Sequence, residues 1–520
     1  MGNKESKNIK GGYVIGILAL LITTLSNLIL TPTIIKHIGS SEYGAYRLIA
    51  SFVTTMSIMD LGLGSTVIRY VAEYRISNDK EKIQNLINFV FLVFIIISLL
   101  ISIIALSCRN IIQIVFSKSL GDMNRNSLLH LFRLTIINLI LTIIVSLYSS
   151  IVQAYEKFVF FKTAGVIRTV IKLSFVFLFL SNNSNAITIA RIDAGVTSSF
   201  LIINYVFCHL VIRVYPKIDL FAFKKLEQSY IREILAFTFF LFVGEIVEQF
   251  LTNVDTIILG IRLTSDDITI YSVGANISLL FRQIAIILSG VLLPFIVRLN
   301  DEGSIVKRNA FFERACRFQA LLLSFIFSAY LVLGRHFIAI WVGEGYHNAW
   351  LSSLFVMLGY LPALITNTGY AVLKACKKHW IYSITYLIIT VINSITTFFI
   401  VPRYGIVGAG FTTMVSILLG HLFILCPYYA RKIELPVFTV YKETIIRIVL
   451  PVSGFSIITW IGVSSFEIKT WRAFIISSLV YSFLFLLLFL FVLLKKEERE
   501  EMISRVKRIR NGKTGLIKKN

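Results

Sequence analysis

The stretch LINFVFLVFIIISLLISIIAL, residues 86–106, contains no charged side chain and has the length of a helix that crosses a bilayer. A hydrocarbon core about 30 Å thick requires about 20 apolar residues in a helix. Runs of this kind recur along the 520-residue chain, which is 56% hydrophobic and 15% charged, with a mean hydropathy of +0.80. Soluble domains carry about 25% charged residues. The composition therefore predicts an all-α polytopic membrane protein.

The apolar runs predict about fourteen transmembrane spans. Lys and Arg are enriched in cytoplasmic loops, so they give an independent test of this count. With both termini placed in the cytoplasm, most of the 51 Lys and Arg residues fall in cytoplasmic segments. We expect a multi-pass protein of a prokaryotic cell (inner) membrane with both termini cytoplasmic. The spans are predicted near residues 13–35, 46–68, 86–106, 129–153, 160–180, 187–211, 233–260, 268–297, 317–341, 349–373, 381–401, 405–427, 446–464 and 472–494.

A weak internal repeat suggests how these spans are grouped. IIKHIGSSEYGAY (34–46) and IILGIRLTSDDITIY (257–271) each follow an apolar run, six spans apart. Copies separated by an even number of spans keep the same orientation, as in transporters with parallel repeats. The sequence predicts an N-lobe over 1–214, a cytoplasmic connector over 215–232, a C-lobe over 233–430, two further helices over 431–495 and a basic cytoplasmic tail over 496–520.

Several function classes lack the residues they require. The net charge of +23 fits basic cytoplasmic loops of a membrane protein, so we expect no nucleic acid partner. The five cysteines are scattered, without metal-ligand or disulfide spacing. GLGS (62–65) lacks the third glycine and the preceding strand of a dinucleotide loop, and no Walker A or H-E-x-x-H motif occurs. We expect no catalytic residue, no metal and no cofactor.

Three stretches carry a family resemblance: IGSSEYGAYRLIASFVTTMSIMDLGLGSTVIRYVAEY (38–74), NVDTIILGIRLTSDDITIYSVGANI (253–277) and VPRYGIVGAGFTTMVS (401–416). They resemble the polysaccharide-biosynthesis transporters, the Wzx-type lipid-linked oligosaccharide flippases. That family belongs to the superfamily of multidrug, oligosaccharidyl-lipid and polysaccharide exporters. The resemblance implies two six-helix lobes in a V around a central cavity, as in the multidrug and toxin extruders (MATE), with two extra C-terminal helices and alternating access.

Cations inside the predicted spans are candidates for binding an anion, because charges in a bilayer must face a cavity or a partner. Arg168 and Lys172 are four residues apart on the helix 160–180 and share a face. Snorkelling to the inner interface is the alternative for Arg168. Arg133 and Arg191 lie near the outer ends of their predicted spans, and for them the alternative is contact with the membrane–water interface. The predicted substrate-binding residues are Arg168, Lys172, Arg282, Arg133 and Arg191.

Acidic residues form a second candidate site. Glu245, Glu248 and Asp255 lie at spacings of three and seven, on one stripe of the predicted helix 233–260. The sequence predicts an ion-coupling site there, with Thr252 and Asn253 nearby as neutral oxygen donors. The alternative is a structural role, in which these carboxylates pair with Arg282 or other buried cations.

Asp60 lies past the midpoint of the predicted helix 46–68. On a continuous helix it shares a polar stripe with Ser57 and Gly64. We expect a structural residue facing the cavity or the lobe interior, paired with a cation of the spans between residues 129 and 211.

The combined features predict a flippase without bond chemistry. It would move a polyprenyl-diphosphate-linked oligosaccharide from the inner to the outer leaflet during surface polysaccharide biosynthesis, with the lipid tail among membrane lipids. Energy would come from a gradient of H⁺ or Na⁺ or from substrate flow, and a glycan polymerase and glycosyltransferases are candidate partners. A cation-coupled multidrug and toxin extruder is the first alternative, although the net cationic set argues against a cationic substrate. A membrane glycan polymerase or ligase is the second, although short outer loops leave little room for an external catalytic segment.

Overall fold

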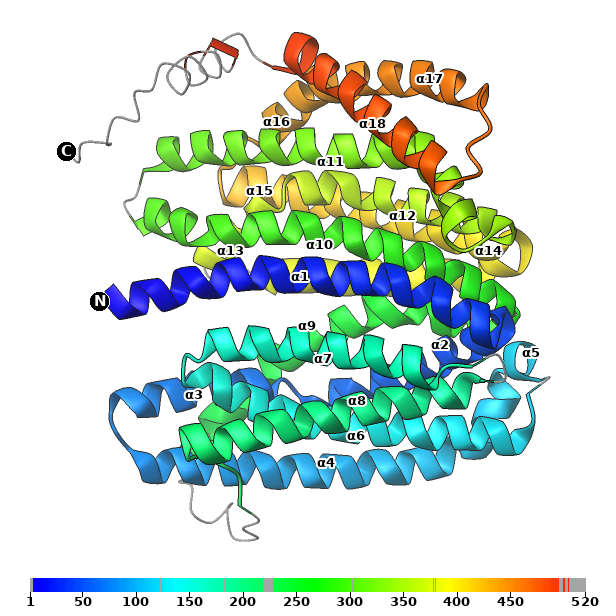
Figure 1. Ribbon diagram of the computed structural model, residues 1–520. Coiled ribbons are helices and arrows are strands. Elements are labelled where there is room, and N and C mark those ends of the chain that lie inside the picture. The colour runs from blue at the N-terminus through cyan, green and yellow to red at the C-terminus, as the bar shows by residue number, and fades with distance from the viewer. Residues whose placement is uncertain are drawn as a thin grey trace. The chain divides into compact units, whose positions relative to one another are not determined.

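The protein is described from a computed structural model that covers residues 3–121, 123–181, 184–217, 228–301, 304–376, 378, 380–494, 499–500 and 504. These residues are almost entirely helical, without a strand among them, so the predicted all-α class is confirmed (Figure 1). A bilayer imposes this outcome, because only a helix satisfies all its backbone hydrogen bonds within one segment. Most of the predicted connector and tail lie outside the described residues.

The helices, in chain order, have the following bounds. They are α1 (Asn3–Ile38), α2 (Ser40–Thr55), η1 (Met56–Asp60), α3 (Leu63–Ile76), α4 (Lys80–Val115), α5 (Ser117–Leu120), α6 (Arg125–Ala154), α7 (Phe158–Phe179), α8 (Ala186–Phe207), η2 (Cys208–Ile212), α9 (Gln228–Arg262), α10 (Ser265–Asp301), α11 (Ile305–Trp341), η4 (Glu344–Tyr346), α12 (His347–Ile365), α13 (Thr368–Ala375), α14 (Trp380–Gly420), η5 (His421–Leu425), α15 (Cys426–Lys432), α16 (Val437–Thr444), η6 (Ile445–Val449), α17 (Leu450–Ser464), α18 (Trp471–Leu488) and η7 (Phe489–Leu493).

The chain is a multi-pass membrane protein. Within the described residues, 10 helical segments are long and apolar enough to cross a membrane. One of them, Trp380–Lys432, is interrupted at Gly405, where φ is 58° and ψ is −148°. The helix α7 is not among them, and its 22 residues carry three cations, Lys162, Arg168 and Lys172. The predicted number of fourteen spans stays a prediction.

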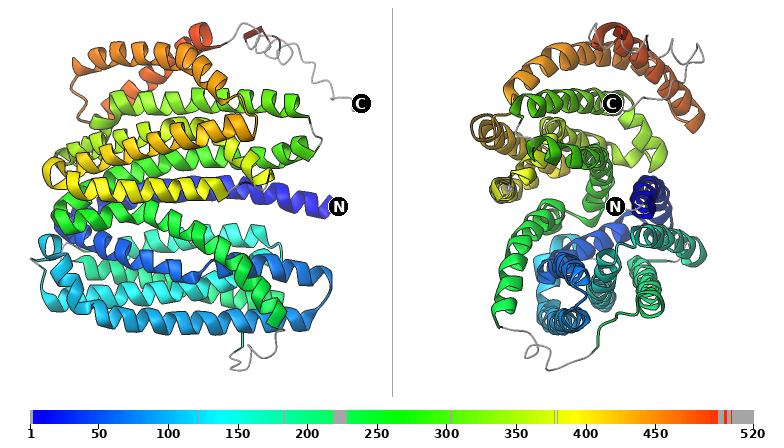
Figure 2. Two further views of the ribbon diagram at one scale, coloured as in Figure 1. Left: turned by 180° about the vertical axis from the view of Figure 1, so that it is seen from behind. Right: turned by 90° about the vertical axis from the view of Figure 1, so that its left-hand side faces the viewer.

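Contacts divide the chain into two units. Unit 1 contains Met1–Leu280, Leu351–Ser353 and Ser383–Ser416, and unit 2 contains Phe281–Trp350, Leu354–Tyr382 and Ile417–Asn520. These bounds are not those of the predicted lobes, which stay a prediction. Within each unit the long helices run side by side, as the two views of Figure 2 show.

In unit 1, α6 packs against α8 and α3, α1 packs against α7, and α2 packs against α9. Leu48 and Ile49 of α2 and Val67 of α3 are fully buried in this core. Glycine permits the close contact between α2 and the start of α10, since a Cβ on Gly44 would lie 1.8 Å from the carbonyl oxygen of Ser265. The helices α2, α3, α4, α6 and α9 all contribute buried side chains to one apolar core.

In unit 2, α11 packs against α16, α17 and α18. The Tyr481 hydroxyl of α18 donates a hydrogen bond of 2.7 Å to Ser328 of α11. His421 is buried, and its Nε2 lies 3.0 Å from the Thr366 hydroxyl and 2.9 Å from the Tyr441 hydroxyl. His421 is thus a hydrogen-bonded packing residue of this unit.

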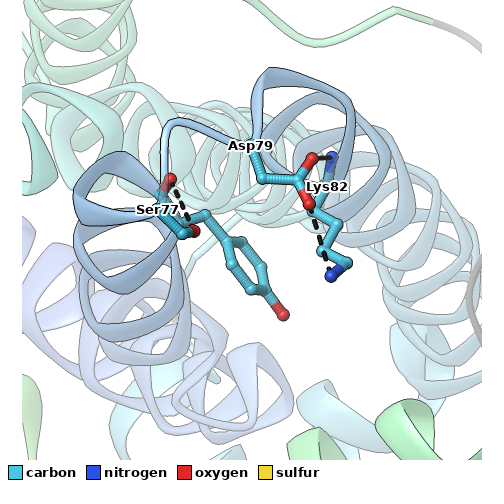
Figure 3. A network of polar contacts seen from close by, with 4 residues as sticks. Ser77, Asp79 and Lys82 are labelled. Carbon is cyan, nitrogen blue, oxygen red and sulfur yellow. Dashed lines mark hydrogen bonds and ion pairs between the residues drawn. The ribbon is translucent and has the colours of Figure 1, made fainter.

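The turn between α3 and α4, at residues 77–79 between two candidate spans, is fixed by side-chain contacts (Figure 3). Asp79 caps α4, because its Oδ1 accepts a hydrogen bond of 3.0 Å from the Lys82 backbone N–H, and its Oδ2 lies 3.3 Å from Lys82 Nζ. The Ser77 hydroxyl donates to the Tyr74 carbonyl oxygen at 3.1 Å. The Lys82 backbone N–H holds the pKa of Asp79 below its ordinary value. The negative charge of Asp79 also interacts favourably with the backbone N–H groups at the start of α4, which have no partner within the helix.

The continuous helix predicted over 46–68 is wrong. The chain leaves α-helical geometry at Met56, forms the 3₁₀ segment η1, and then takes left-handed conformations at Leu61 (φ 58°) and Gly62 (φ 74°) before α3 begins. Glycine adopts positive φ readily, whereas a leucine rarely does so. We call Met56–Gly62 the helix break.

Candidate functional site

Lys172 of α7 lies in an ion pair. Its Nζ is 2.7 Å from Oδ1 of Asp193 on α8, and the Tyr46 hydroxyl of α2 donates a hydrogen bond to Oδ2 of the same carboxylate. The Lys172 side chain is 34% exposed and that of Asp193 is 14% exposed. Side chains of three helices, α2, α7 and α8, thus meet at the Asp193 carboxylate.

Arg168 lies one helical turn from Lys172, on the same face of α7. Its Nη2 is 3.5 Å from the Thr197 hydroxyl, and its guanidinium is 5.2 Å from the centre of the Phe200 ring. Asp193, Thr197 and Phe200 are spaced by four and three residues, so they lie on one face of α8. The predicted shared face of Arg168 and Lys172 therefore meets α8.

The charges of this cluster do not cancel. Arg168 and Lys172 supply two positive charges, and Asp193 supplies one negative charge that acts on both. One positive charge remains on the described side chains of the cluster, which we call the α7–α8 cationic site (Arg168, Lys172 and Asp193). A half-buried site with surplus positive charge can bind an anion such as a phosphate through charge-assisted hydrogen bonds.

The other predicted cations lie elsewhere. Arg133 is exposed, and Arg191 is exposed with Nη2 3.5 Å from His130 Nε2. Arg282 belongs to unit 2, where its guanidinium lies 4.5 Å from the centre of the Tyr360 ring. The structure thus brings Arg168 and Lys172 together, and substrate binding by all five predicted residues stays a prediction.

Among the predicted ion-coupling residues, Asp255 is buried in a hydrogen-bond network of unit 1. Its Oδ1 accepts from Asn393 Nδ2 at 2.9 Å, and its Oδ2 accepts from the hydroxyls of Tyr271 and Thr413, each at 3.0 Å. Three donors thus satisfy the Asp255 carboxylate, and ion coupling at this residue stays a prediction. No group of three His, Cys, Asp or Glu side chains that could hold a metal occurs among the described residues.

The remaining residues of the predicted stripe have different surroundings. Glu245 and Glu248 are exposed, unlike Asp255. The neutral donors proposed beside Asp255 are used within α9, since Thr252 donates to the Glu248 carbonyl oxygen at 2.8 Å and Asn253 donates to Gln249 Oε1 at 3.0 Å. The stripe therefore splits into one buried carboxylate and two exposed ones.

Asp60 lies in the helix break. Its Oδ2 accepts a hydrogen bond of 3.4 Å from the Ser146 hydroxyl of α6, and its Oδ1 is inaccessible to solvent and lacks a hydrogen-bond partner among the described residues. The predicted pairing of Asp60 with a cation between residues 129 and 211 is wrong, because among the described residues its Oδ2 contacts the Ser146 hydroxyl and its Oδ1 has no partner. Its structural role stays a prediction.

Sequence reasoning missed five residues that surround Lys172 and Asp255. Asp193 pairs with Lys172, and Tyr46 donates a hydrogen bond to Asp193. Three residues donate to Asp255, namely Tyr271, Asn393 and Thr413. An acidic residue within an apolar span was the available signal for Asp193, because an unpaired carboxylate there is costly. The other four are neutral polar residues, and nothing in their local sequence distinguishes them from packing residues.

Comparisons with known proteins identify relatives of this chain. A family model described as "Polysaccharide biosynthesis protein" matches residues 10–300. A Shigella flexneri protein named "Putative O-antigen transporter" is 22% identical over 397 residues, which is 74% of this chain and 90% of that protein.

Two solved structures show the same fold. The lipid II flippase MurJ in an inward closed conformation matches with a TM-score of 0.70 and 17% identity, over 91% of this chain and 98% of that one. An inward-facing multidrug resistance MATE family transporter of the MOP superfamily matches with a TM-score of 0.66 and 13% identity, over 82% of this chain and 99% of that one. With its family model matched over more than half of its length, the chain belongs to the polysaccharide biosynthesis protein family.

Proposed function

We propose that this protein is a flippase that moves a polyprenyl-diphosphate-linked oligosaccharide from the inner to the outer leaflet of a prokaryotic cell (inner) membrane. Family membership, the named O-antigen transporter relative and the fold shared with a lipid II flippase support this proposal. These relatives carry the names of transporters and flippases, and we propose that this chain is a transporter rather than an enzyme. Both termini would lie in the cytoplasm.

The α7–α8 cationic site is the observation that carries the proposal. A lipid diphosphate must bring its negative charge into a medium of low dielectric, where a fixed positive charge stabilises it strongly. Asp193, which accepts a hydrogen bond from Tyr46, holds the Lys172 ammonium, while Arg168 provides several donors on the same face. The surplus positive charge selects an anion and disfavours the cationic amphiphiles that a multidrug and toxin extruder exports.

Movement of the substrate requires two access states and a source of energy. Asp255 and its neutral oxygen neighbours are our proposed site for H⁺ or Na⁺ coupling, together with Glu245 and Glu248. A charge that crosses 100 mV gains about 2.3 kcal/mol, which is enough to bias two states. Substrate flow, with glycosyltransferases supplying and a polymerase consuming the lipid-linked glycan, is the alternative source.

Deletion of the gene tests the proposal. We expect lipid-linked oligosaccharide to accumulate on the inner leaflet, and wild-type protein to relieve it. Lys172→Ala should fail to relieve it although the protein reaches the membrane. Lys162→Ala is the matched control, because Lys162 is an exposed cation of the same helix and should remain functional.

The alternatives give different results. Unpolymerised units that accumulate outside the membrane would indicate a glycan polymerase or ligase. Unchanged glycan with a new sensitivity to cationic dyes would indicate a multidrug extruder.

A further inference from the structure

Several candidate spans begin or end around residues 433–436, in unit 2. One span ends at Lys432, and the next begins at Val437. A third, Ile305–Trp341, brings the first turn of α11 to the same place, as the contacts of that turn show. Lys and Arg at such span ends meet the headgroup layer of a bilayer, where anionic lipids attract them.

Two consecutive carbonyl groups at the end of α15 accept hydrogen bonds from cations. Arg308 of α11 donates from Nη2 to the Ile433 carbonyl oxygen at 2.7 Å. Lys378 donates from Nζ to the Lys432 carbonyl oxygen at 3.5 Å. The end of a helix carries a partial negative charge, so it attracts cations. The guanidinium and the ammonium group therefore gather at one helix end.

Arg308 is a buried cation without a carboxylate partner among the described residues. It is 8% exposed, and its Nε is enclosed without a hydrogen-bond partner there. Its Nη1 makes no hydrogen bond to the described residues either, and it remains accessible to solvent. A charge removed from water is costly unless it is paired. The guanidinium thus has unused donors and an unbalanced charge.

The surroundings of Arg308 carry further positive charge. We call Arg308, Lys378 and Lys432 the α15-end cationic site. None of the three forms an ion pair within the described part of the chain. The neighbouring acid is Glu434, which is exposed, and the helix end supplies a partial charge of about −0.5. Surplus positive charge therefore remains, and an anionic phosphate can supply both the negative charge and the acceptor oxygens.

Large apolar side chains next to this site are exposed in the structure. They are Ile305 and Val306 before Arg308, Trp380 after Lys378, and Phe438 after the end of α15. Tryptophan is enriched at the membrane–water interface. A phospholipid can contact the cations with its phosphate and these side chains with its acyl chains, whereas a free phosphate can contact only the cations.

We propose that the α15-end cationic site binds the phosphate of an anionic phospholipid. Arg308 donates to the phosphate oxygens from Nη1 while its Nη2 stays on the Ile433 carbonyl oxygen, and the Lys378 ammonium adds a second positive charge. The bound lipid joins the start of α11 to the end of α15. This role does not depend on which substrate the protein carries.

Native mass spectrometry of the full-length protein in a neutral detergent tests the site. We expect wild-type protein to bind phosphatidylglycerol more tightly than phosphatidylcholine, which has no net charge. Arg308→Gln should lower the phosphatidylglycerol affinity by about tenfold or more, the effect of losing a hydrogen bond between charged groups. Lys378→Gln should lower it by about fivefold. Lys378→Gln keeps the contact of Arg308 with α15, so it tests the site even where Arg308→Gln fails to fold.

Arg472→Gln is the matched control and should keep the wild-type affinity. Arg472 is an exposed arginine of unit 2 at the start of α18, beyond the far end of the span Val437–Ser464. Equal wild-type affinity for the two lipids, or unchanged affinity in Lys378→Gln, would overturn the proposal. Inorganic phosphate should leave the lipid bound, and displacement would assign the site to free phosphate instead. No lipid-linked oligosaccharide is used, so failure here is distinct from failure of the flippase function.

Discussion

Replacing Lys172 by Gln removes the ammonium that neutralises Asp193 between α7 and α8. The carboxylate then keeps its hydrogen bond from the Tyr46 hydroxyl but loses the positive charge at 2.7 Å. This substitution therefore tests whether the Lys172–Asp193 ion pair stabilises the fold, contributes to substrate binding, or does both.

The magnitude follows from how far the pair is enclosed. An exposed ion pair contributes about 0–1 kcal/mol, whereas breaking a buried pair costs about 3–5 kcal/mol. Lys172 is 34% exposed and Asp193 is 14% exposed, so the pair lies between these limits. We expect Lys172→Gln to lower the free energy of unfolding by about 2 kcal/mol, which is about 30-fold in the unfolding equilibrium.

The assay is denaturant unfolding of the purified protein in mixed micelles, with wild type, both single variants and the double variant Lys172→Gln with Asp193→Asn. The double variant should recover most of the lost stability, because no unpaired charge remains. The cycle of four proteins isolates the interaction energy of the pair.

Transport should follow the net charge of the α7–α8 cationic site. Lys172→Gln leaves Arg168 and Asp193, which cancel, so flipping should be lost. The double variant leaves Arg168 alone and restores one positive charge, so flipping should return in part. A single variant as stable as wild type, or a double variant no more stable than Lys172→Gln, would refute the reasoning about the pair.

Three further predictions concern packing, capping and the buried acid. Gly44→Ala should destabilise unit 1 by about 1–3 kcal/mol through overpacking against the Ser265 carbonyl, whereas Gly165→Ala, with open space around it, should not, as thermal unfolding would show. Asp79→Ala should increase hydrogen exchange in the first turn of α4 at pH 7. Because the folded-state pKa of Asp79 lies below its ordinary value, the cap contributes stability above the ordinary pKa and loses it as pH falls through the folded pKa, so the two proteins should converge in strong acid. Asp255→Asn should cost about 1–3 kcal/mol in denaturant unfolding, because it presents an amide donor to a network of donors.

The fold class could be predicted because a bilayer permits few structures. In a bilayer, the length of the apolar runs is enough to predict helices, and the three stretches that resemble the transporter family agree with that prediction. Hydropathy does not report backbone conformation, however, and so the helix break was missed. The available signal was the sequence Asp60-Leu61-Gly62. Aspartate is a weak helix former, and Gly62 adopts a positive φ.

The candidate site could be predicted only along single helices. The period of 3.6 residues places Arg168 and Lys172 on one face of α7 without knowledge of its neighbours. The partners of Lys172 depend on how α8 and α2 are rotated against α7, and those rotations arise from packing of the whole unit. The same holds for Asp255, whose partner Asn393 is 138 residues away.

Leaflet exchange in proteoliposomes tests the central claim most directly. The purified protein would be reconstituted with a fluorescent polyprenyl-diphosphate-linked oligosaccharide, and a membrane-impermeant reagent would report the fraction in the outer leaflet. We predict protein-dependent exchange that is lost in a folded variant with Arg168→Gln, Lys172→Gln and Asp193→Asn, whose site has no charge. Wild-type protein that leaves the glycolipid in its leaflet while it transports a cationic dye would contradict the account.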